Sequence, residues 1–254
     1  MDLKDIVNDG YLLGGVQAKF SDIALLSLRT AMKAYFSTYR PMRHSLHLYA
    51  VGARPDERTL EHNIPHEYCE FAAEAILHFQ HFIELIVKDI LRREHPLLAD
   101  VASDDAVILH KLLMSEPLSL DEERGLRSLE FSESYKRLHK LIGAGRVDAK
   151  EFGFVADGKP WIDQLNVLRN RIWHRGAYVL HYPALDELVG RYILPFVVQV
   201  AELERYDLPM WRHKKLSCGI DPIEEIVREV ATSPFDLKKV AFLKELGRAA
   251  YNCP

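Results

Sequence analysis

The sequence has few cysteines, no excess of basic charge and no long hydrophobic run. Its three cysteines, Cys69, Cys218 and Cys253, lack the spacing of metal ligands, so we expect no disulfide framework and a reducing compartment. The net charge of −4 argues against a surface coated in basic charge, but it leaves room for a local basic groove. Neither a signal peptide nor an apolar stretch of about 18 residues is visible. We therefore expect a cytoplasmic protein with no membrane partner.

Repeats, low-complexity tracts and convincing strand patterns are also missing, and what remains is helical. Apolar residues recur at steps of three and four, most clearly over residues 66–93, which is the period of one helix face. With 254 residues the chain is long enough to bury a sizeable core. The predicted fold class is all-α: a helical bundle with an irregular N-terminal loop region and a small helical C-terminal extension.

Three regions are predicted along the chain: an N-terminal helix and irregular segment over residues 1–65, the bundle over 66–206 and the extension over 207–254. The N-terminal region holds a helix at 21–40 and a short strand at 46–51. A Gly-rich polar separator is predicted at 153–159. The other predicted helices lie at 103–114, 121–142, 160–176, 183–206, 221–231 and 234–250.

The predicted helix at 160–176 ends in a basic cluster, LNVLRNRIWHRG, in which four residues separate Arg169 from His174. This spacing is weak by itself, because three comparable Arg–His pairs occur in the chain and about three are expected by chance. Only Arg169 and His174 lie in a predicted helix with an apolar stripe, and only there does a polar residue, Asn170, follow the arginine. The local context therefore singles out this pair.

The run from Leu168 to Gly176 resembles the motif of the HEPN superfamily. In that family an arginine, usually a polar residue, a few more residues and a histidine lie in a late helix of an α-helical bundle. The segment FQHFIELIVK, residues 79–88, is similar to the family's first long core helix. The resemblance covers residues 68–204, so the first 65 residues and the C-terminal tail fall outside it.

The resemblance implies a metal-independent endoribonuclease without a cofactor, in which two motifs meet across a homodimer. His174 would be the acid and base, Arg169 the phosphate-binding group, and Asn170 the residue that orients one of them. The implied partners are RNA and a second copy of the chain. The family also suggests an antitoxin or regulatory partner, in a toxin or antiviral context.

The residue types suit metal-free cleavage of RNA. Histidine exchanges a proton near neutral pH, and arginine offers a planar fork of donors for phosphate oxygens. At about 100° per residue, however, Arg169 and His174 point roughly 140° apart on a regular helix. A loosened last turn, the reach of arginine or a second protomer is needed to join them. We predict that the face carrying Asp163, Val167, Asn170 and His174 is buried against a symmetry mate.

Each site residue also has a structural interpretation that stays open. His174 suits a helix C-terminus, where the helix dipole favours it, and Arg169 suits a salt bridge at the rim of the core. Arg171 and Arg175 either bind RNA phosphates or form a solvated helix face. The alternative function is a non-catalytic HEPN-like module for dimerisation or RNA binding.

Two residues of the long helix, Glu84 and Lys88, are expected either to support the active site or to form an ordinary ion pair four residues apart. Tyr178 and Tyr182 either stack on bases or pack in the core. The basic patch at residues 212–215 is more typical of a solvated loop than of an RNA contact.

Glu74, His78 and His81 share one flank of the long helix, and three such residues could suggest a metal site. No second cluster at a matching spacing supports it. No metal is therefore expected.

Overall fold

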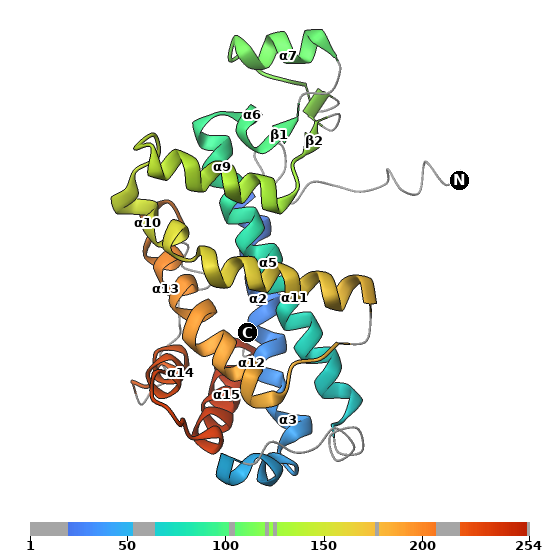
Figure 1. Ribbon diagram of the computed structural model, residues 1–254, viewed down its shortest axis with the longest axis vertical. Helices are drawn as coiled ribbons and strands as arrows, with labels where there is room; N and C mark the ends of the chain where they lie inside the picture. The colour runs from blue at the N-terminus through green and yellow to red at the C-terminus, as the bar shows by residue number, and fades with distance from the viewer. Residues whose placement is uncertain are drawn as a thin grey trace, which may run out of the picture. The chain divides into compact units, whose positions relative to one another are not determined.

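The computed structural model describes residues 20–52, 64–101, 105–119, 122–123, 126–175, 178–206 and 219–252. The side chains of residues 20–22, 50–52, 175, 205 and 251–252 lie outside this description. Helices dominate the described residues, so the predicted all-α class is confirmed (Figure 1). No helix among them has the length and apolarity needed to cross a bilayer.

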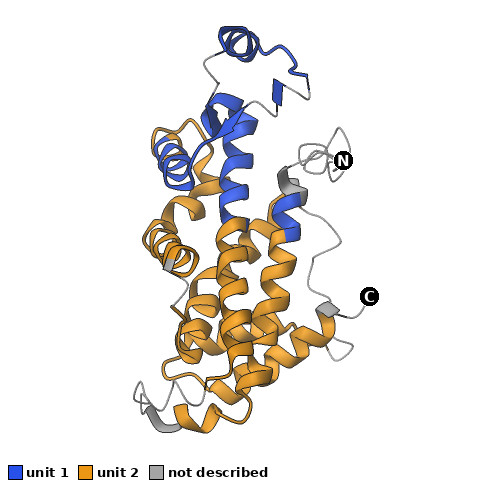
Figure 2. Cartoon of the chain, turned by 90° about the vertical axis from the view of Figure 1, so that its right-hand side faces the viewer, with its two compact units in different colours: residues 1–26, 82–140 blue, residues 27–81, 141–254 orange. Residues whose placement is uncertain are grey.

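The chain forms two compact units, residues 1–26 with 82–140 and residues 27–81 with 141–254 (Figure 2). Helices α2 (Phe20–Ser37) and α5 (His66–Glu94) contribute residues to both units. The boundaries predicted at residues 65 and 206 both fall inside the second unit. The predicted division into three regions stays a prediction.

The first unit is built on the second half of α5. It also contains α6 (Pro96–Ala99), β1 (Asp100–Val101), α7 (Ala106–Leu113), β2 (Arg127–Ser128) and most of α9 (Phe131–Gly143). β1 and β2 pair antiparallel, with Asp100 opposite Ser128. Arg92 of α5 fixes this ribbon, because its Nε and Nη2 each lie 2.6 Å from an oxygen of the buried Asp100 carboxylate.

The predicted helix at 121–142 is not continuous: residues 122–123 and 131–142 are helical, but a strand interrupts it. Residues 127–128 form β2, and the Leu129 amide donates to the Ala99 carbonyl at 3.0 Å, so this backbone pairs with β1 and not with itself. Glu122 and Glu123 are helical, as expected of acids in a first helical turn, and Ser119 and Glu122 cap this turn reciprocally. Glu122 accepts hydrogen bonds from Lys111 Nζ at 2.7 Å and from the Ser119 amide at 2.8 Å.

The second unit contains residues 27–37 of α2, residues 66–81 of α5 and most of the remaining helices. These are α3 (Tyr39–Met42), η2 (Leu46–Gly52), α10 (Ala149–Asp157), α11 (Lys159–Arg175), α12 (Tyr182–Leu188), η3 (Val189–Ile193), α13 (Leu194–Glu202), η4 (Glu204–Tyr206), α14 (Pro222–Ala231) and α15 (Leu237–Asn252). The predicted helix at 21–40 ends at Ser37, and the one at 183–206 is interrupted by the π-helical η3.

Two predictions for this unit are wrong. The strand at 46–51 is the 3-10 helix η2, and most of the polar separator at 153–159 lies within α10. α10 forms because Asp148 caps it, accepting a hydrogen bond from the Lys150 amide at 2.8 Å. It also buries Phe152 and Val155, three residues apart on one face, which outweighs the weak helix propensity of Gly153.

The two C-terminal helices pack into the second unit. α14 contacts α15 and η3, and α15 contacts α3. Two glycines allow a close approach of the elements that meet there. A Cβ on Gly190 would lie 2.8 Å from Val230, and one on Gly247 would lie 2.6 Å from the ring of Phe36. The predicted C-terminal helices are therefore part of this unit's packing.

A charged cluster lies in the core of the second unit, where Lys244 and Asp186 form an ion pair with no exposed surface. Lys244 Nζ also donates to Thr38 Oγ1 at 2.9 Å and lies 4.4 and 4.3 Å from the ring centroids of Tyr35 and Tyr182. Burial raises the pKa of the Asp186 carboxyl and lowers the pKa of Lys244, and each charge opposes the shift of the other.

Candidate functional site

The Arg/His motif lies at the C-terminal end of α11, which stays α-helical through His174 to Arg175. Leu165 and Leu168 on one face are buried, and Ile172 is half-buried, so this face holds the helix against the unit. A regular helix keeps Arg169 and His174 on different faces, and the loosened last turn considered from the sequence does not occur.

Arg169 is half-buried and contacts its own helix. Its Nη1 donates to Asn170 Oδ1 at 2.9 Å, and its guanidinium carbon lies 5.7 Å from the ring centroid of Trp173. Within the part of the chain that the structure describes, no acidic side chain pairs with Arg169 and no hydrogen bond joins it to His174. The salt bridge at the core rim, one reading of Arg169, is therefore not formed there.

Two exposed aromatic rings accompany the arginines. Trp173 is 64% exposed, and Tyr178, which follows the helix end, is 40% exposed. The guanidinium carbon of Arg171 lies 5.6 Å from the Tyr178 ring centroid. Sequence reasoning missed Trp173, although its place beside His174 and off the apolar stripe was a readable signal. Tyr182 is buried, so core packing is the right interpretation for that residue.

The far face of α11 is open in the single chain. Asp163, Val167, Asn170 and His174 are all exposed, and Val167 has an exposed fraction of 43%. That a second copy covers this face stays a prediction. The main chain of Arg175 ends the helix, and its side chain lies outside the described residues.

Glu84 and Lys88 form an ion pair within α5, with Lys88 Nζ 2.6 Å from Glu84 Oε1. The Lys88 side chain is only 6% exposed, so this is a largely buried contact of the first unit. The interpretation as a pair four residues apart is confirmed. A role in supporting the active site stays a prediction.

The flank of α5 with Glu74, His78 and His81 carries a different contact. The Nδ1 of His81 lies 2.8 Å from Ser27 Oγ of α2. Among the residues for which the structure gives positions, no three His, Cys, Asp or Glu side chains gather as a metal-binding group.

Comparison of the chain with protein-family models, with curated proteins and with solved structures gives no match. The resemblance to the HEPN superfamily therefore depends on the motif in α11 and on the pattern of α5. The function has to be argued from the chemistry of these side chains.

Proposed function

We propose that the chain is a metal-independent endoribonuclease of the HEPN type, active as a homodimer. One observation carries the proposal: basic, polar and aromatic side chains gather at the exposed end of α11 without an acidic partner among the described residues. This α11 cluster consists of Arg169, Asn170, Arg171, Trp173, His174 and Tyr178.

The chemistry needs one proton acceptor, one proton donor and a group that stabilises phosphate charge. His174 of one protomer takes the proton of the ribose 2′-OH, and the 2′-oxygen forms a bond to phosphorus. The bond from phosphorus to the 5′-oxygen breaks, and the second His174 donates a proton to that oxygen. Arg169 holds the non-bridging oxygens. The products are a 2′,3′-cyclic phosphate and a 5′-OH end.

A second copy of the chain is part of this proposal because one α11 keeps its two motif residues about 140° apart. Two helices packed through the open face would bring two copies of each residue to one cleft. Val167 is the apolar residue on that face, at 43% exposure, and lies beside Asn170 and His174 in the helical repeat. We infer that it lies at the centre of the dimer contact.

The aromatic members of the cluster add a means of holding RNA. Unpaired bases stack on exposed aromatic rings, and arginines beside them neutralise the phosphates. Trp173 with Arg169, and Tyr178 with Arg171, are two such pairs. Binding by these pairs would position a phosphate near His174.

The direct test is incubation of the purified protein with a labelled single-stranded RNA in excess chelator. We expect cleavage, and a loss of at least about a hundredfold in rate for His174→Ala and for Arg169→Ala, as for removal of an acid–base or phosphate-binding group. His110→Ala and Arg146→Ala, which change exposed residues elsewhere in the chain, should keep the activity. New ends that a kinase labels directly would show the 5′-OH product. Cleavage that needs metal, or that survives both motif substitutions, would overturn the mechanism.

The dimer is tested with Val167→Glu, which adds a charge to the open face and leaves the motif side chains in place. We expect the variant to be monomeric in analytical ultracentrifugation and to lose cleavage. If the variant cleaves RNA as a monomer, the composite site is wrong.

The second candidate is a non-catalytic RNA-binding or dimerisation module. This candidate is favoured because Arg169 contacts Asn170 and Trp173 and not His174. RNA binding that Trp173→Ala weakens, with no cleavage under any condition, would select this candidate.

A further inference from the structure

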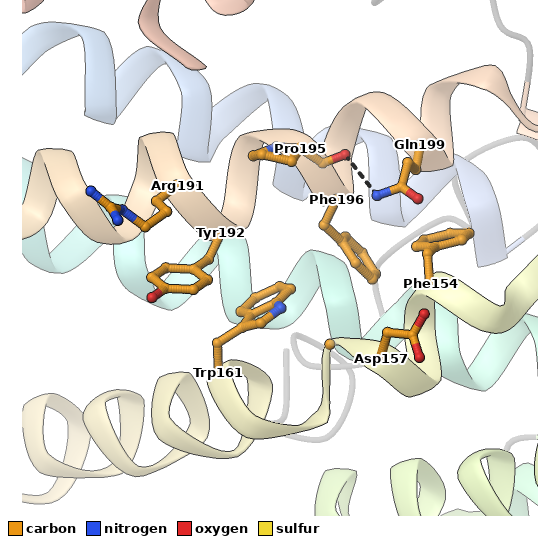
Figure 3. Close-up of a pocket in the computed structure, with 9 residues that line it drawn as sticks. Phe154, Asp157, Trp161, Arg191, Tyr192, Pro195, Phe196 and Gln199 are labelled. Carbon is orange, nitrogen blue, oxygen red and sulfur yellow. Dashed lines mark hydrogen bonds between the residues drawn. The ribbon is translucent and has the colours of Figure 1, made fainter. Parts of the chain in front are cut away.

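The second unit has a pocket of about 250 Å³ that lies away from the motif, at the start of α11 (Figure 3). Four elements line it: the end of α10, the first turn of α11, the π-helical η3 and the first turns of α13. The side chains that matter for its chemistry are Phe154, Asp157, Trp161, Arg191, Tyr192 and Phe196.

The walls are aromatic rings, of which Phe154 and Trp161 each stand at a steep angle to Phe196. Phe196 is 3% exposed and forms the floor, and the rings of Trp161 and Phe154 meet it at 77° and 62° with centroids 5.6 and 5.2 Å away. Tyr192 lies on the other side of Trp161, with centroids 6.4 Å apart and planes at 31°. Rings in such edge-to-face and tilted contacts line the pocket with both edges and electron-rich faces.

The backbone builds these walls for identifiable reasons. Pro195 has no N–H to give to the carbonyl four residues earlier, and its ring would clash with that carbonyl in an α-helix. The chain widens into η3, where the Leu194 amide bonds to the Val189 carbonyl five residues back, and this turn carries Tyr192. Opposite it, a Cβ on Gly158 would lie 3.1 Å from Trp161 Nε1, so this glycine lets the indole pack close to the turn.

The pocket lining contains one carboxylate and one guanidinium, and only the carboxylate lacks an ion pair among the described residues. Asp157 is exposed and has no ion pair in the described part of the chain, and its nearest lysine in sequence, Lys159, bonds to Asp163 at 2.6 Å. Arg191 is already engaged, because its Nη2 lies 3.1 Å from the Val230 carbonyl oxygen and 3.3 Å from Glu187.

Figure 3 shows where the two charged side chains lie. The guanidinium of Arg191 is turned away from the rings, whereas Asp157 lies on the side of Phe154. Gln199 also lies on the side of Phe154 and donates its amide N–H to the Pro195 carbonyl at 3.4 Å, which leaves the amide oxygen as an acceptor. The lining therefore offers a ligand aromatic rings, one carboxylate and an amide oxygen, beside a guanidinium that Glu187 already pairs.

We propose that this pocket binds an alkylated ammonium group. Such a cation is attracted to aromatic faces, loses little hydration on leaving water, and is neutralised by a carboxylate at the rim. Neutral aromatic ligands would gain from the rings but not from Asp157, and anions would be repelled by it. The group comes either from a free quaternary ammonium compound or from a methylated lysine side chain.

The test is calorimetric titration of the full chain with choline and, separately, with 3,3-dimethylbutan-1-ol, its uncharged isostere. We expect saturable binding of choline and none, or at least about tenfold weaker binding, of the isostere. Asp157→Asn should weaken choline binding about three- to tenfold, and Tyr192→Leu similarly, because each removes one attractive group at an exposed position. Glu74→Gln, an exposed carboxylate change on α5, should leave it unchanged.

The two sources of the cation are separated by titrating trimethyllysine as the free amino acid and within a short peptide. Tighter binding of the peptide indicates a protein side chain, and equal binding indicates a free metabolite. Equal affinity for choline and its isostere, an unchanged affinity in Asp157→Asn, or no saturable binding of any of these compounds would overturn the proposal. His174→Ala should bind choline normally, so this result stands or falls separately from RNA cleavage.

Discussion

The core of the second unit and the end of α11 both hold cations beside aromatic rings, but they treat the charge in opposite ways. In the core, Lys244 has no exposed surface and is matched by Asp186. At the end of α11, Arg171 is exposed beside Tyr178, and the structure gives neither it nor Arg169 an acidic partner among the described residues.

This difference links the buried pair to the stability of the fold and the exposed arginines to the binding of a ligand. A buried charge without its partner is expensive, so Lys244 and Asp186 are tied to the stability of the fold. Exposed arginines without acidic partners contribute little to stability, and their charge stays available for a ligand. Substitutions in the two regions should therefore change different measurements.

The largest effect is expected from a substitution that breaks the core cluster. Lys244→Met keeps the length of the side chain but leaves Asp186 buried without its cation, and we expect the free energy of unfolding to fall by about 3–5 kcal/mol. Urea denaturation followed by circular dichroism measures this change. Adding Asp186→Leu to Lys244→Met should recover most of the loss, because no charge then stays buried. A double variant as unstable as the single one would contradict this account.

A smaller effect is expected one turn further along α15, at Gly247. Gly247→Ala places a Cβ against the Phe36 ring, which must shift, and should lower the free energy of unfolding by about 1–3 kcal/mol. Gly153→Ala is the matched control, because no atom lies within 4 Å of the added Cβ in α10. That variant should be stabilised by about 0.5–1 kcal/mol, as for glycine in a helix. If both variants changed Tm by the same amount, the close approach of α15 to Phe36 would not determine the loss of stability.

For a substitution at the end of α11 we expect a change in RNA affinity and little change in stability. Trp173→Ala should reduce the affinity for single-stranded RNA about five- to hundredfold, because one stacking ring is lost, while the unfolding free energy changes by less than about 0.5 kcal/mol. Fluorescence anisotropy with a labelled oligonucleotide measures the first quantity and thermal denaturation the second. Phe242→Ala removes another exposed ring, at 61% exposure on α15, and should change neither.

Most helices were predictable because their signals are local. The apolar period of α5, the Pro160 start of α11 and the two C-terminal helices needed only nearby residues. The errors occurred where distant contacts decide the outcome. Pairing of β2 with β1 interrupted a predicted helix, and burial of Phe152 made α10 helical across a glycine.

The candidate site shows the same division. Arg169, Asn170 and His174 were found because one helix carries them all, and the contact of Arg169 with Asn170 joins neighbours in sequence. The contact of Arg171 with Tyr178 crosses the helix end, so helical periodicity does not contain it. The Lys244 cluster was not foreseen, since its members come from α2, from Thr38 just after it, from α12 and from α15, which are far apart in the sequence.

The smallest effect is expected for a second ion pair of α15, which can be compared with the buried pair of Lys244 and Asp186. Lys239 forms an ion pair with Glu229 of α14 at 2.6 Å, at the surface and not in the core. Lys239 and the Asp236 amide lower the pKa of the Glu229 carboxyl, so its contribution to stability is complete above the unfolded pKa and is lost as the pH falls through the folded pKa. Glu229→Gln should therefore lower Tm slightly at neutral pH and match the parent chain in acid. The control is Glu74→Gln, at an exposed carboxylate that has no ion pair among the described residues. A Tm loss at neutral pH as large as that of Lys244→Met would mean that burial does not set the difference between the two pairs.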